Sequence, residues 1–344
     1  MGCFIIAEAG VNHGGQENLA FALVDAAAAA GADAVKFQTF EAEKLVVPGT
    51  ETLAYQHANT GAIDQFAMLK SLELPAETYK KLAAHCDARD IEFLSTPFDE
   101  SSADRLLDLG MKRIKVPSGE ITNIPLLRYL AAKDRAILLS TGMSTLEEVE
   151  GAVAVIAEER MRRNFRDPLR QKLIILHCTS NYPAHMEDAN LRAIVTLREK
   201  LDLPVGFSDH TEGTVASLAA VAMGAVVVEK HFTLDRSLPG PDQNASLTPE
   251  ELSRMIADIR TVEQAFGDGV KQPRPRELPV RDLVRRSLTL KRAVDSGHEI
   301  VIDDLVLLRP GTGIPSKEAS NVVGCRAVRP LPAGHVLQWH DIVR

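Results

Sequence analysis

The feature that most constrains the fold is a regular alternation of short apolar runs and longer helix-like stretches over the first 266 residues. Eight β-rich runs predict strands at Phe4–Ala7, Ala34–Phe37, Ile91–Leu94, Arg113–Val116, Ala136–Leu139, Leu173–Leu176, Val205–Phe207 and Ala225–Val228. The stretches between them predict helices, among them Asn18–Ala30, Ala76–Arg89, Leu146–Glu159, Asn190–Lys200 and Glu250–Phe266. Because the runs are continuously apolar rather than alternating, they indicate parallel strands covered by helices.

Local signals mark the helix ends. Thr145 and Thr248 have the pattern of N-terminal caps, and glycines at 31, 110 and 224 are placed to end helices just before the next strand. Eight strand–helix units close most naturally into a (β/α)₈ TIM barrel. The alternative is an open doubly wound sheet, but no G-x-G-x-x-G motif follows any strand. We expect the longer insertion at residues 41–74 to be a loop that covers the barrel mouth.

The C-terminal part of the chain differs in composition from the barrel, predicted at residues 1–266. Residues 267–285 are rich in Gly, Pro and Arg and predict a linker. Residues 286–344 form a small module in which a Gly-His…Asp pattern beginning at Gly297 recurs at Gly334, a period of 37. The whole chain carries a net charge of −8, yet residues 270–344 carry +5. This asymmetry suggests that the basic module and linker dock onto the acidic barrel of a partner subunit.

Several classes of protein are excluded by simple counts. No apolar run reaches the roughly 20 residues that a membrane-spanning helix needs. The N-terminus lacks the basic and apolar regions of a signal peptide, and the four cysteines have no paired spacing. These observations favour a cytoplasmic protein. The acidic balance argues against nucleic acid as a partner.

Polar side chains fall at the C-terminal ends of all eight predicted strands, where barrels of this kind build their active sites. They are Glu8, Asn12, Lys36, Gln38, Thr96, Lys115, Ser118, Ser140, His177, Asn181, Tyr182, Ser208, Asp209, His210, Glu229, Lys230 and His231. A single charged residue at one strand end is compatible with a solvated edge, but polar residues at every end favour a functional site.

His210 and His231 would end adjacent strands, which lie about 4.8 Å apart, so both imidazoles can reach one cation. Two neutral histidines together with water and substrate oxygens suit Mn²⁺, Fe²⁺, Co²⁺ or Zn²⁺. The alternative is that each histidine is a buried hydrogen-bonding residue, and the spacing alone leaves both interpretations open.

Lys36 and Lys115, together with the nearby hydroxyls, predict a site for a small anion that carries phosphate and carboxylate groups. A competing interpretation makes one lysine a Schiff-base residue, which leaves the paired histidines without a role. Glu8 and Glu229 would be neighbours across the barrel closure and suit sugar hydroxyls or proton transfer, although either carboxylate could be purely structural.

Seven blocks of the sequence resemble the signature blocks of the sialic acid (N-acetylneuraminate) synthase family. They are Ile6-Ala7-Glu8-Ala9-Gly10-Val11-Asn12-His13, Val35-Lys36-Phe37-Gln38-Thr39, Ser95-Thr96-Pro97-Phe98, Lys115-Val116-Pro117-Ser118-Gly119-Glu120, Ser140-Thr141-Gly142-Met143, Gly206-Phe207-Ser208-Asp209-His210 and Glu229-Lys230-His231-Phe232-Thr233. The C-terminal module, with Arg309-Pro310-Gly311-Thr312-Gly313-Ile314, is similar to that family's antifreeze-like (SAF) domain.

The resemblance implies a metal-dependent transferase. Phosphoenolpyruvate would condense with an open-chain N-acetylated hexosamine, foremost N-acetylmannosamine, to give N-acetylneuraminate and phosphate. It implies His210 and His231 as ligands of Mn²⁺ and assigns seven residues to phosphoenolpyruvate: Lys36, Thr96, Lys115, Ser118, Ser140, Asn181 and Ser208. It assigns six to the sugar: Glu8, Gln38, Tyr182, Glu229, Asp242 and Arg309. Either Glu8 or Glu229 would be the catalytic proton shuttle, and Arg309 would come from the partner subunit of a domain-swapped homodimer.

Three alternative functions remain open. The same chemistry on a 2,4-diacetamido-trideoxyhexose would give a legionaminate or pseudaminate. The sequence departs from the family pattern at His13-Gly14-Gly15, Gln243 and Ala184-His185, and these departures bear on the identity of the sugar. A Schiff-base lyase is a second enzymatic hypothesis. A non-enzymatic one makes the C-terminal module a binding unit and the barrel a scaffold.

Overall fold

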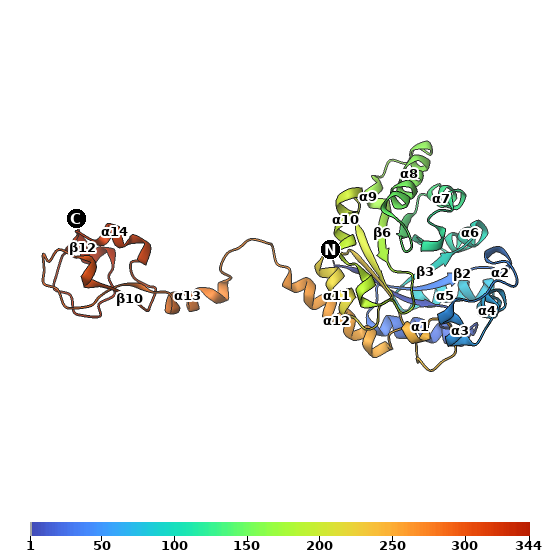
Figure 1. The fold of residues 1–344 in the computed structure, drawn as a ribbon, viewed down its shortest axis with the longest axis horizontal. Coiled ribbons are helices and arrows are strands. Elements are labelled where there is room, and N and C mark those ends of the chain that lie inside the picture. Colours follow the sequence, from blue (N-terminus) through green and yellow to red (C-terminus); the bar gives the residue numbers. More distant parts are fainter. Residues whose placement is uncertain (1) are drawn as a thin grey trace. The chain divides into compact units, whose positions relative to one another are not determined.

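In the computed structural model, which describes residues 2–344, eight parallel strands form one sheet in the first part of the chain (Figure 1). They are β1 (Phe4–Gly10), β2 (Ala34–Thr39), β3 (Glu92–Pro97), β4 (Arg113–Val116), β5 (Ala136–Ser140), β6 (Leu173–Cys178), β7 (Val205–Asp209) and β8 (Val227–His231). Their hydrogen-bonded order is β3-β2-β1-β8-β7-β6-β5-β4, and the end strands β3 and β4 also lie side by side. The predicted eight-stranded barrel is therefore confirmed.

One helix follows each strand and covers the outside of the barrel. These are α1 (Glu17–Ala30), α5 (Ala76–Ala88), α6 (Glu100–Asp108), α7 (Ile124–Ala131), α8 (Leu146–Arg162), α10 (Arg192–Leu201), α11 (Val215–Ala222) and α12 (Pro249–Ala265), with the short α9 (Leu169–Lys172) before β6. The predicted caps form, since Thr145 and Thr248 each accept a hydrogen bond from the backbone N–H three residues on. No helix within residues 2–344 is long and apolar enough to cross a membrane.

The strands extend further into the polar segments than their apolar runs predict. β1 continues to Gly10, and β8 covers Val227–His231 rather than Ala225–Val228. The cause is the parallel pairing of β1 with β8, which continues until Glu8 lies opposite His231. Site residues such as Glu8, Glu229 and His231 are thus part of the ladder itself, which fixes their positions more firmly than a loop would.

The sequence suggested that the insertion at residues 41–74 is a loop, and this prediction is wrong. The insertion contains three short helices. They are α2 (Ala42–Leu45), α3 (Ala54–Thr60) and α4 (Gln65–Leu72). Val11, Phe40, Met68 and Leu72 form a small hydrophobic cluster of their own that joins the insertion to the barrel mouth. Burial of these four side chains gives the insertion a defined structure.

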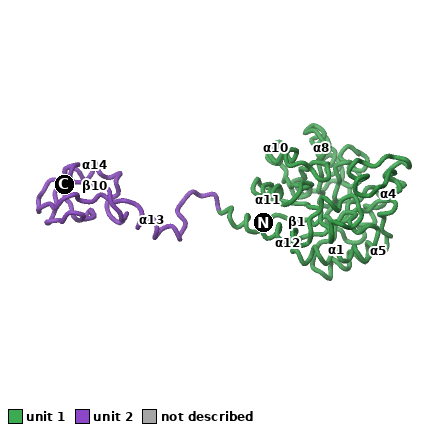
Figure 2. Tube along the Cα trace, turned by 60° about the horizontal axis from the view of Figure 1, so that its bottom comes forward, with its two compact units in different colours: residues 1–267 green, residues 268–344 purple. Residues whose placement is uncertain are grey.

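Asp268–Arg344 form a second compact unit, separate from Met1–Gly267 (Figure 2). It contains α13 (Leu278–Val284), β9 (Ser287–Leu290), β10 (Leu305–Leu308), α14 (Ala319–Val322), β11 (Arg326–Ala327) and β12 (Ile342–Val343). The antiparallel pairs β9–β10 and β11–β12 pack with other apolar side chains around a core that includes Leu288, Ile300 and Leu337.

The 37-residue repeat has a structural explanation in this unit. His298 pairs with Asp304 at 2.9 Å, and His335 pairs with Asp341 at 2.7 Å, while both aspartates are fully buried. Each aspartate also accepts a hydrogen bond from a backbone N–H three residues earlier. The repeated Gly-His…Asp pattern therefore fixes two equivalent turns.

Candidate active site

A cavity of about 390 Å³ opens at the C-terminal ends of the barrel strands. Its volume lies in the range of small-molecule sites, roughly 300–1,000 Å³. Thirteen of the predicted site residues line it: Glu8, Lys36, Gln38, Thr96, Lys115, Ser118, Ser140, Tyr182, Ser208, His210, Glu229, His231 and Asp242. The barrel thus brings together side chains that lie more than 200 positions apart in the sequence.

Two predicted residues do not lie in this cavity. Asn181 is exposed, and its neighbour Ser180 lines the cavity instead. Arg309 belongs to the second unit, where it is exposed directly after β10. The sequence could not resolve the first case, because Ser180 and Asn181 are adjacent polar residues in one loop and only the backbone path decides which of them points inward.

Four buried charged residues form the floor of the cavity. Lys36 Nζ lies 2.7 Å from Glu8 Oε2 and 3.6 Å from Glu229 Oε2, and Lys115 Nζ lies 3.2 Å from Glu229 Oε1. Lys36 also donates a hydrogen bond to Thr96 Oγ1 at 3.0 Å. Two ammonium groups and two carboxylates, all shielded from water, make strong local fields, so small changes in charge at this floor have large effects.

The two carboxyl groups differ in electrostatic character. Burial raises the pKa of Glu8 to about 7, against the opposing effect of Lys36. Burial also acts to raise the pKa of Glu229, but Lys115 and Lys36 together hold it well below its ordinary value. Ser208 further favours the Glu229 carboxylate by donating a hydrogen bond at 2.7 Å. One carboxyl is therefore poised to carry a proton near neutral pH, and the other stays ionised.

The two histidines are arranged as a pair, with ring centroids 5.6 Å apart. His210 Nδ1 lies 2.6 Å from the Thr179 carbonyl oxygen, which fixes the proton on Nδ1 and leaves the lone pair on Nε2. His231 Nδ1 is buried without a hydrogen-bond partner, 4.0 Å from Asp242 Oδ2. Burial lowers the pKa of His210 to about 4 and that of His231 well below its ordinary value, so both rings are neutral.

These properties fit a divalent cation. Neutral imidazoles with free lone pairs are metal ligands, and the carbonyl partner of His210 is a typical second-shell support. Within residues 2–344 no group of three or more His, Cys, Asp or Glu side chains has metal-binding geometry. A cation held by the two histidines would take its remaining ligands from water and substrate oxygens.

Two hydroxyl-bearing residues, Ser118 and Ser180, converge on Gly142 in the loop after β5. The Gly142 N–H donates to Ser118 Oγ at 2.9 Å, and a Cβ atom added at Gly142 would lie 2.2 Å from Ser180 Oγ. Ser140 Oγ is buried nearby in the cavity lining without a partner. Serine hydroxyls gathered in this way at a cavity edge are suited to donate hydrogen bonds to an anion, and this group of residues is called the cradle below.

The sequence placed the insertion over the barrel mouth but did not identify which of its residues line the cavity. Tyr55, Gln56, Met68, Leu69 and Leu72 are among them. The ring of Tyr55 stacks on Tyr182 at 5.4 Å, and Tyr182 in turn lies 4.2 Å from the ring of His210. An apolar periodicity within residues 54–72 could have revealed two short helices, but nothing in the pattern shows that they face the cavity.

Other polar residues at the strand ends have structural roles. Asp209 and Lys230 form a fully buried ion pair at 3.1 Å, and Asp209 also accepts a hydrogen bond from Ser217 on α11. His177 bonds to the carbonyl of Ala189, and Asn12 donates to the carbonyl of Phe232. None of these four strand-end side chains lines the cavity.

Comparisons with known proteins agree with this geometry. The NeuB family profile matches residues 23–271, and the SAF domain profile matches residues 285–343. An N,N'-diacetyllegionaminic acid synthase from Legionella pneumophila is 50% identical over 99% of this chain and 95% of its own. A Campylobacter jejuni protein of the same name is 43% identical over 93% of this chain and 94% of its own.

A solved structure is also similar. The crystal structure of an N-acetylneuraminic acid synthetase from Leptospira borgpetersenii has a TM-score of 0.70 and 34% identity, covering 81% of this chain and 90% of its own.

Proposed function

Because this chain belongs to the NeuB family of phosphoenolpyruvate-condensing nonulosonic acid synthases and carries a C-terminal SAF domain, we propose that its sugar substrate is a 2,4-diacetamido-trideoxyhexose and its product a legionaminate. The relatives that make diacetyllegionaminic acid are 50% and 43% identical to the chain, against 34% for the N-acetylneuraminic acid synthetase of known structure. These identities support the legionaminate alternative better than the N-acetylneuraminate expected first.

The observation that carries the proposal is the charged cavity floor beside a histidine pair. Lys36 and Lys115, with the hydroxyls of Thr96, Ser118, Ser140 and Ser208, would bind the phosphate and carboxylate of phosphoenolpyruvate. Ser180 replaces Asn181 in this assignment, since it is Ser180 that lines the cavity. Gln38, Tyr182 and Asp242 would bind the sugar, together with Glu8 and Glu229.

The reaction joins C3 of phosphoenolpyruvate to the aldehyde carbon of the sugar. Water then adds at C2 to give a tetrahedral intermediate. The bond between C2 and the phosphate oxygen breaks, and phosphate is released. The aldehyde oxygen has to gain a proton, and the attacking water has to lose one. The raised pKa of Glu8 suits the donor, and the ionised Glu229 suits the acceptor, so the two carboxyl groups would balance the protons.

We propose Mn²⁺ as the metal, held by His210 and His231. When bound, such an ion polarises the aldehyde as a Lewis acid. Lys36 and Lys115 would stabilise the charge that develops on the departing phosphate, since preorganised positive groups act strongly at a buried site.

Arg309 is proposed to reach the sugar from the second subunit of a domain-swapped homodimer. It is exposed on the second unit and is not used in any ion pair described within residues 2–344, so its guanidinium is available to a ligand. An Arg309→Ala enzyme should raise the KM of the sugar much more than that of phosphoenolpyruvate. Equal effects on both KM values would contradict the assignment.

The direct test is phosphate release from phosphoenolpyruvate in the presence of Mn²⁺ and a panel of sugars. We expect the highest kcat/KM with 2,4-diacetamido-2,4,6-trideoxymannose. Faster turnover of N-acetylmannosamine, or of the isomeric precursor of pseudaminate, would replace the proposed sugar, and no release with any sugar would refute the proposal altogether.

A further inference from the structure

The cavity has two chemically different walls. The floor, at the strand ends, carries Lys36, Lys115, Glu8 and Glu229. Val11 and the insertion residues Tyr55, Met68, Leu69 and Leu72 also line the cavity, beside Leu53 and the two amides Gln56 and Gln65. Val11, Tyr55, Met68, Leu69 and Leu72 are called the apolar wall below.

Packing fixes the apolar wall in place. Val11, Met68 and Leu72 are buried and belong to the small cluster that Leu69 also contacts. Tyr55 is held from the other side by its stacking on Tyr182. A side chain fixed in this way cannot move aside to let water solvate a polar group placed against it.

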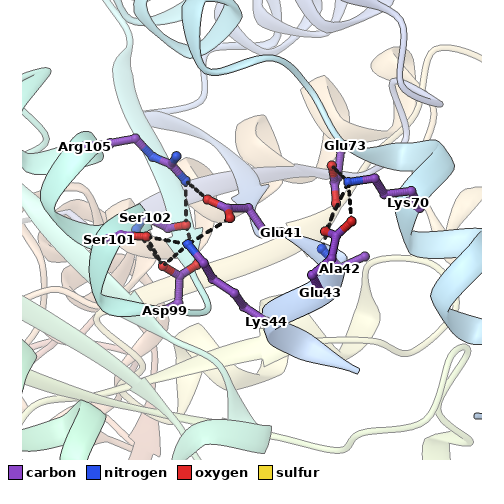
Figure 3. Close-up of polar contacts among 10 residues, drawn as sticks. All are labelled: Glu41, Ala42, Glu43, Lys44, Lys70, Glu73, Asp99, Ser101, Ser102 and Arg105. Atoms are coloured by element: carbon purple, nitrogen blue, oxygen red, sulfur yellow. Dashed lines mark hydrogen bonds and ion pairs between the residues drawn. The ribbon is translucent and has the colours of Figure 1, made fainter. Parts of the chain in front are cut away.

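Ion pairs on the outer surface hold the insertion against the barrel (Figure 3). Glu41 pairs with Arg105 of α6 at 2.9 Å, and Lys70 bridges Glu43 and Glu73 at 2.9 and 3.0 Å. The backbone N–H of Ala42 donates to Glu73 at 2.7 Å. Each exposed pair contributes little alone, but together they join α2 and α4 to one another and to α6.

We propose that the apolar wall is the specificity-determining surface for the end of the sugar remote from the aldehyde, and that it receives the C6 methyl and the second acetamido group. This inference rests on the proposed function. The aldehyde carbon has to lie at the charged floor, near the histidine pair. The far end of a sugar held there points away from the floor and therefore toward the insertion.

The chemistry of the two sugars separates them at this wall. The diacetamido-trideoxyhexose presents its C6 methyl and an acetyl methyl, which gain free energy when buried against Met68, Leu69 and Tyr55, while Gln56 and Gln65 line the same cavity and can pair with the amide of the acetamido group. N-acetylmannosamine presents a hydroxyl at C6 in place of the methyl, and this hydroxyl loses hydrogen bonds to water without finding a partner on Val11, Met68, Leu69 or Leu72. A hydrophobic pocket discriminates against an added hydroxyl by only about 100-fold, so the wall accounts for a preference of that order and not for absolute exclusion.

The test compares two leucines of the same hydrophobic cluster in the full-length enzyme. Leu69→Asn places an amide in the cavity, whereas Leu45→Asn makes the same exchange in the cluster away from the cavity. The measured quantity is the ratio of kcat/KM for 2,4-diacetamido-2,4,6-trideoxymannose to kcat/KM for N-acetylmannosamine. We expect Leu69→Asn to lower this ratio about tenfold or more with the KM of phosphoenolpyruvate unchanged, and Leu45→Asn to leave it as in the wild type.

The outcomes separate the inference from the function on which it rests. If the wild type prefers the diacetamido sugar and a folded Leu69→Asn enzyme keeps that preference, the apolar wall does not determine sugar specificity, while the proposed function stands. The same conclusion follows if Leu45→Asn lowers the kcat/KM ratio as much as Leu69→Asn does. A wild-type preference for N-acetylmannosamine overturns both. Met68→Gln, which nearly conserves volume, replaces Leu69→Asn should that variant not fold, and the same ratio decides.

Discussion

Glu8 lies directly opposite Lys36 on β2 and opposite His231 on β8, with its Oε2 atom 2.7 Å from Lys36 Nζ. This register places one carboxyl group between the floor lysine and one of the paired histidines. The register is set by the ladders that β1 forms with β2 and β8 up to Glu8, before β1 bulges toward Gly10, so the arrangement depends on the barrel and not on a flexible loop. Glu8 is therefore the residue where the anion-binding floor meets the histidine pair.

A Glu8→Gln enzyme should fold and bind phosphoenolpyruvate but turn over about 10²–10⁴-fold more slowly, the usual contribution of a positioned acid or base. The amide keeps the shape of the side chain and cannot exchange a proton. Phosphate release measures turnover, and calorimetry measures binding of phosphoenolpyruvate. Turnover within threefold of the wild type, on the order of measurement scatter for such comparisons, would exclude Glu8 as the proton donor.

His210→Ala should weaken Mn²⁺ binding by at least about tenfold, since it removes a ligand where even second-shell changes cost roughly 10–100-fold. Electron paramagnetic resonance of free Mn²⁺ during a titration measures the affinity without any need for activity. His177→Ala is the matched control, because His177 also ends a strand but bonds to a backbone carbonyl outside the cavity. Equal affinity in the two variants would count against the histidine pair as the metal site.

Gly142→Ala should raise the KM of phosphoenolpyruvate about tenfold, because overpacking of this kind costs roughly 1–3 kcal/mol. The new methyl group would lie 2.2 Å from Ser180 Oγ and 2.9 Å from Ser118 Oγ, so the cradle has to open. Gly119→Ala is the control, since Gly119 lines the same cavity yet a Cβ there meets no atom within 4 Å. A rise confined to the KM of the sugar would show that the cradle serves the other substrate.

The second unit should lose stability in acid, because two of its buried aspartates stabilise the fold only while they are ionised. Burial opposes ionisation of Asp304, but hydrogen bonds from His298 and from the Val301 N–H prevail and lower its pKa to about 2 from 3.8. The pKa of Asp341 is lowered in the same direction, with His335 as the main favourable partner. A lowered folded-state pKa stabilises the fold above the unfolded pKa, and that contribution is lost as the pH falls from about 4 toward 2.

Trp339, the only tryptophan in the chain, lies in this unit and gives a selective fluorescence signal in the intact protein. At neutral pH, Asp304→Asn should lower the unfolding midpoint of that signal by roughly 6–24 °C, because hydrogen bonds to a charged group contribute about 1.5–3 kcal/mol and each kcal/mol shifts the midpoint of so small a unit by about 4–8 °C. Asp303→Asn is the matched control, since its side chain is exposed. Equal midpoints for the two variants would show that the repeated aspartate does not hold the turn.

Much of this protein could be predicted from residue patterns. The apolar runs specify buried parallel strands, and eight such units specify a barrel, because closure buries the inner face of the sheet while the helices cover its outer face. Thirteen site residues followed from their places at strand ends and from motif resemblance, since a barrel directs every C-terminal strand end to one face. The repeat at Gly297 and Gly334 was visible as well, because each copy needs the same glycine, histidine and aspartate to form its turn.

Only the tertiary structure decided which neighbouring side chains face the cavity and what surrounds them. Ser180 points inward and Asn181 does not, a difference that depends on the path of one loop. Burial raises the pKa of Glu8 despite Lys36, whereas Lys115 and Lys36 lower the pKa of Glu229 despite its burial, and no sequence spacing contains these distances. The apolar wall exists because α3 and α4 fold back over strand ends that are distant in sequence. Sequence encodes local periodicity, whereas electrostatics and cavity lining depend on distances between segments that only the folded chain brings together.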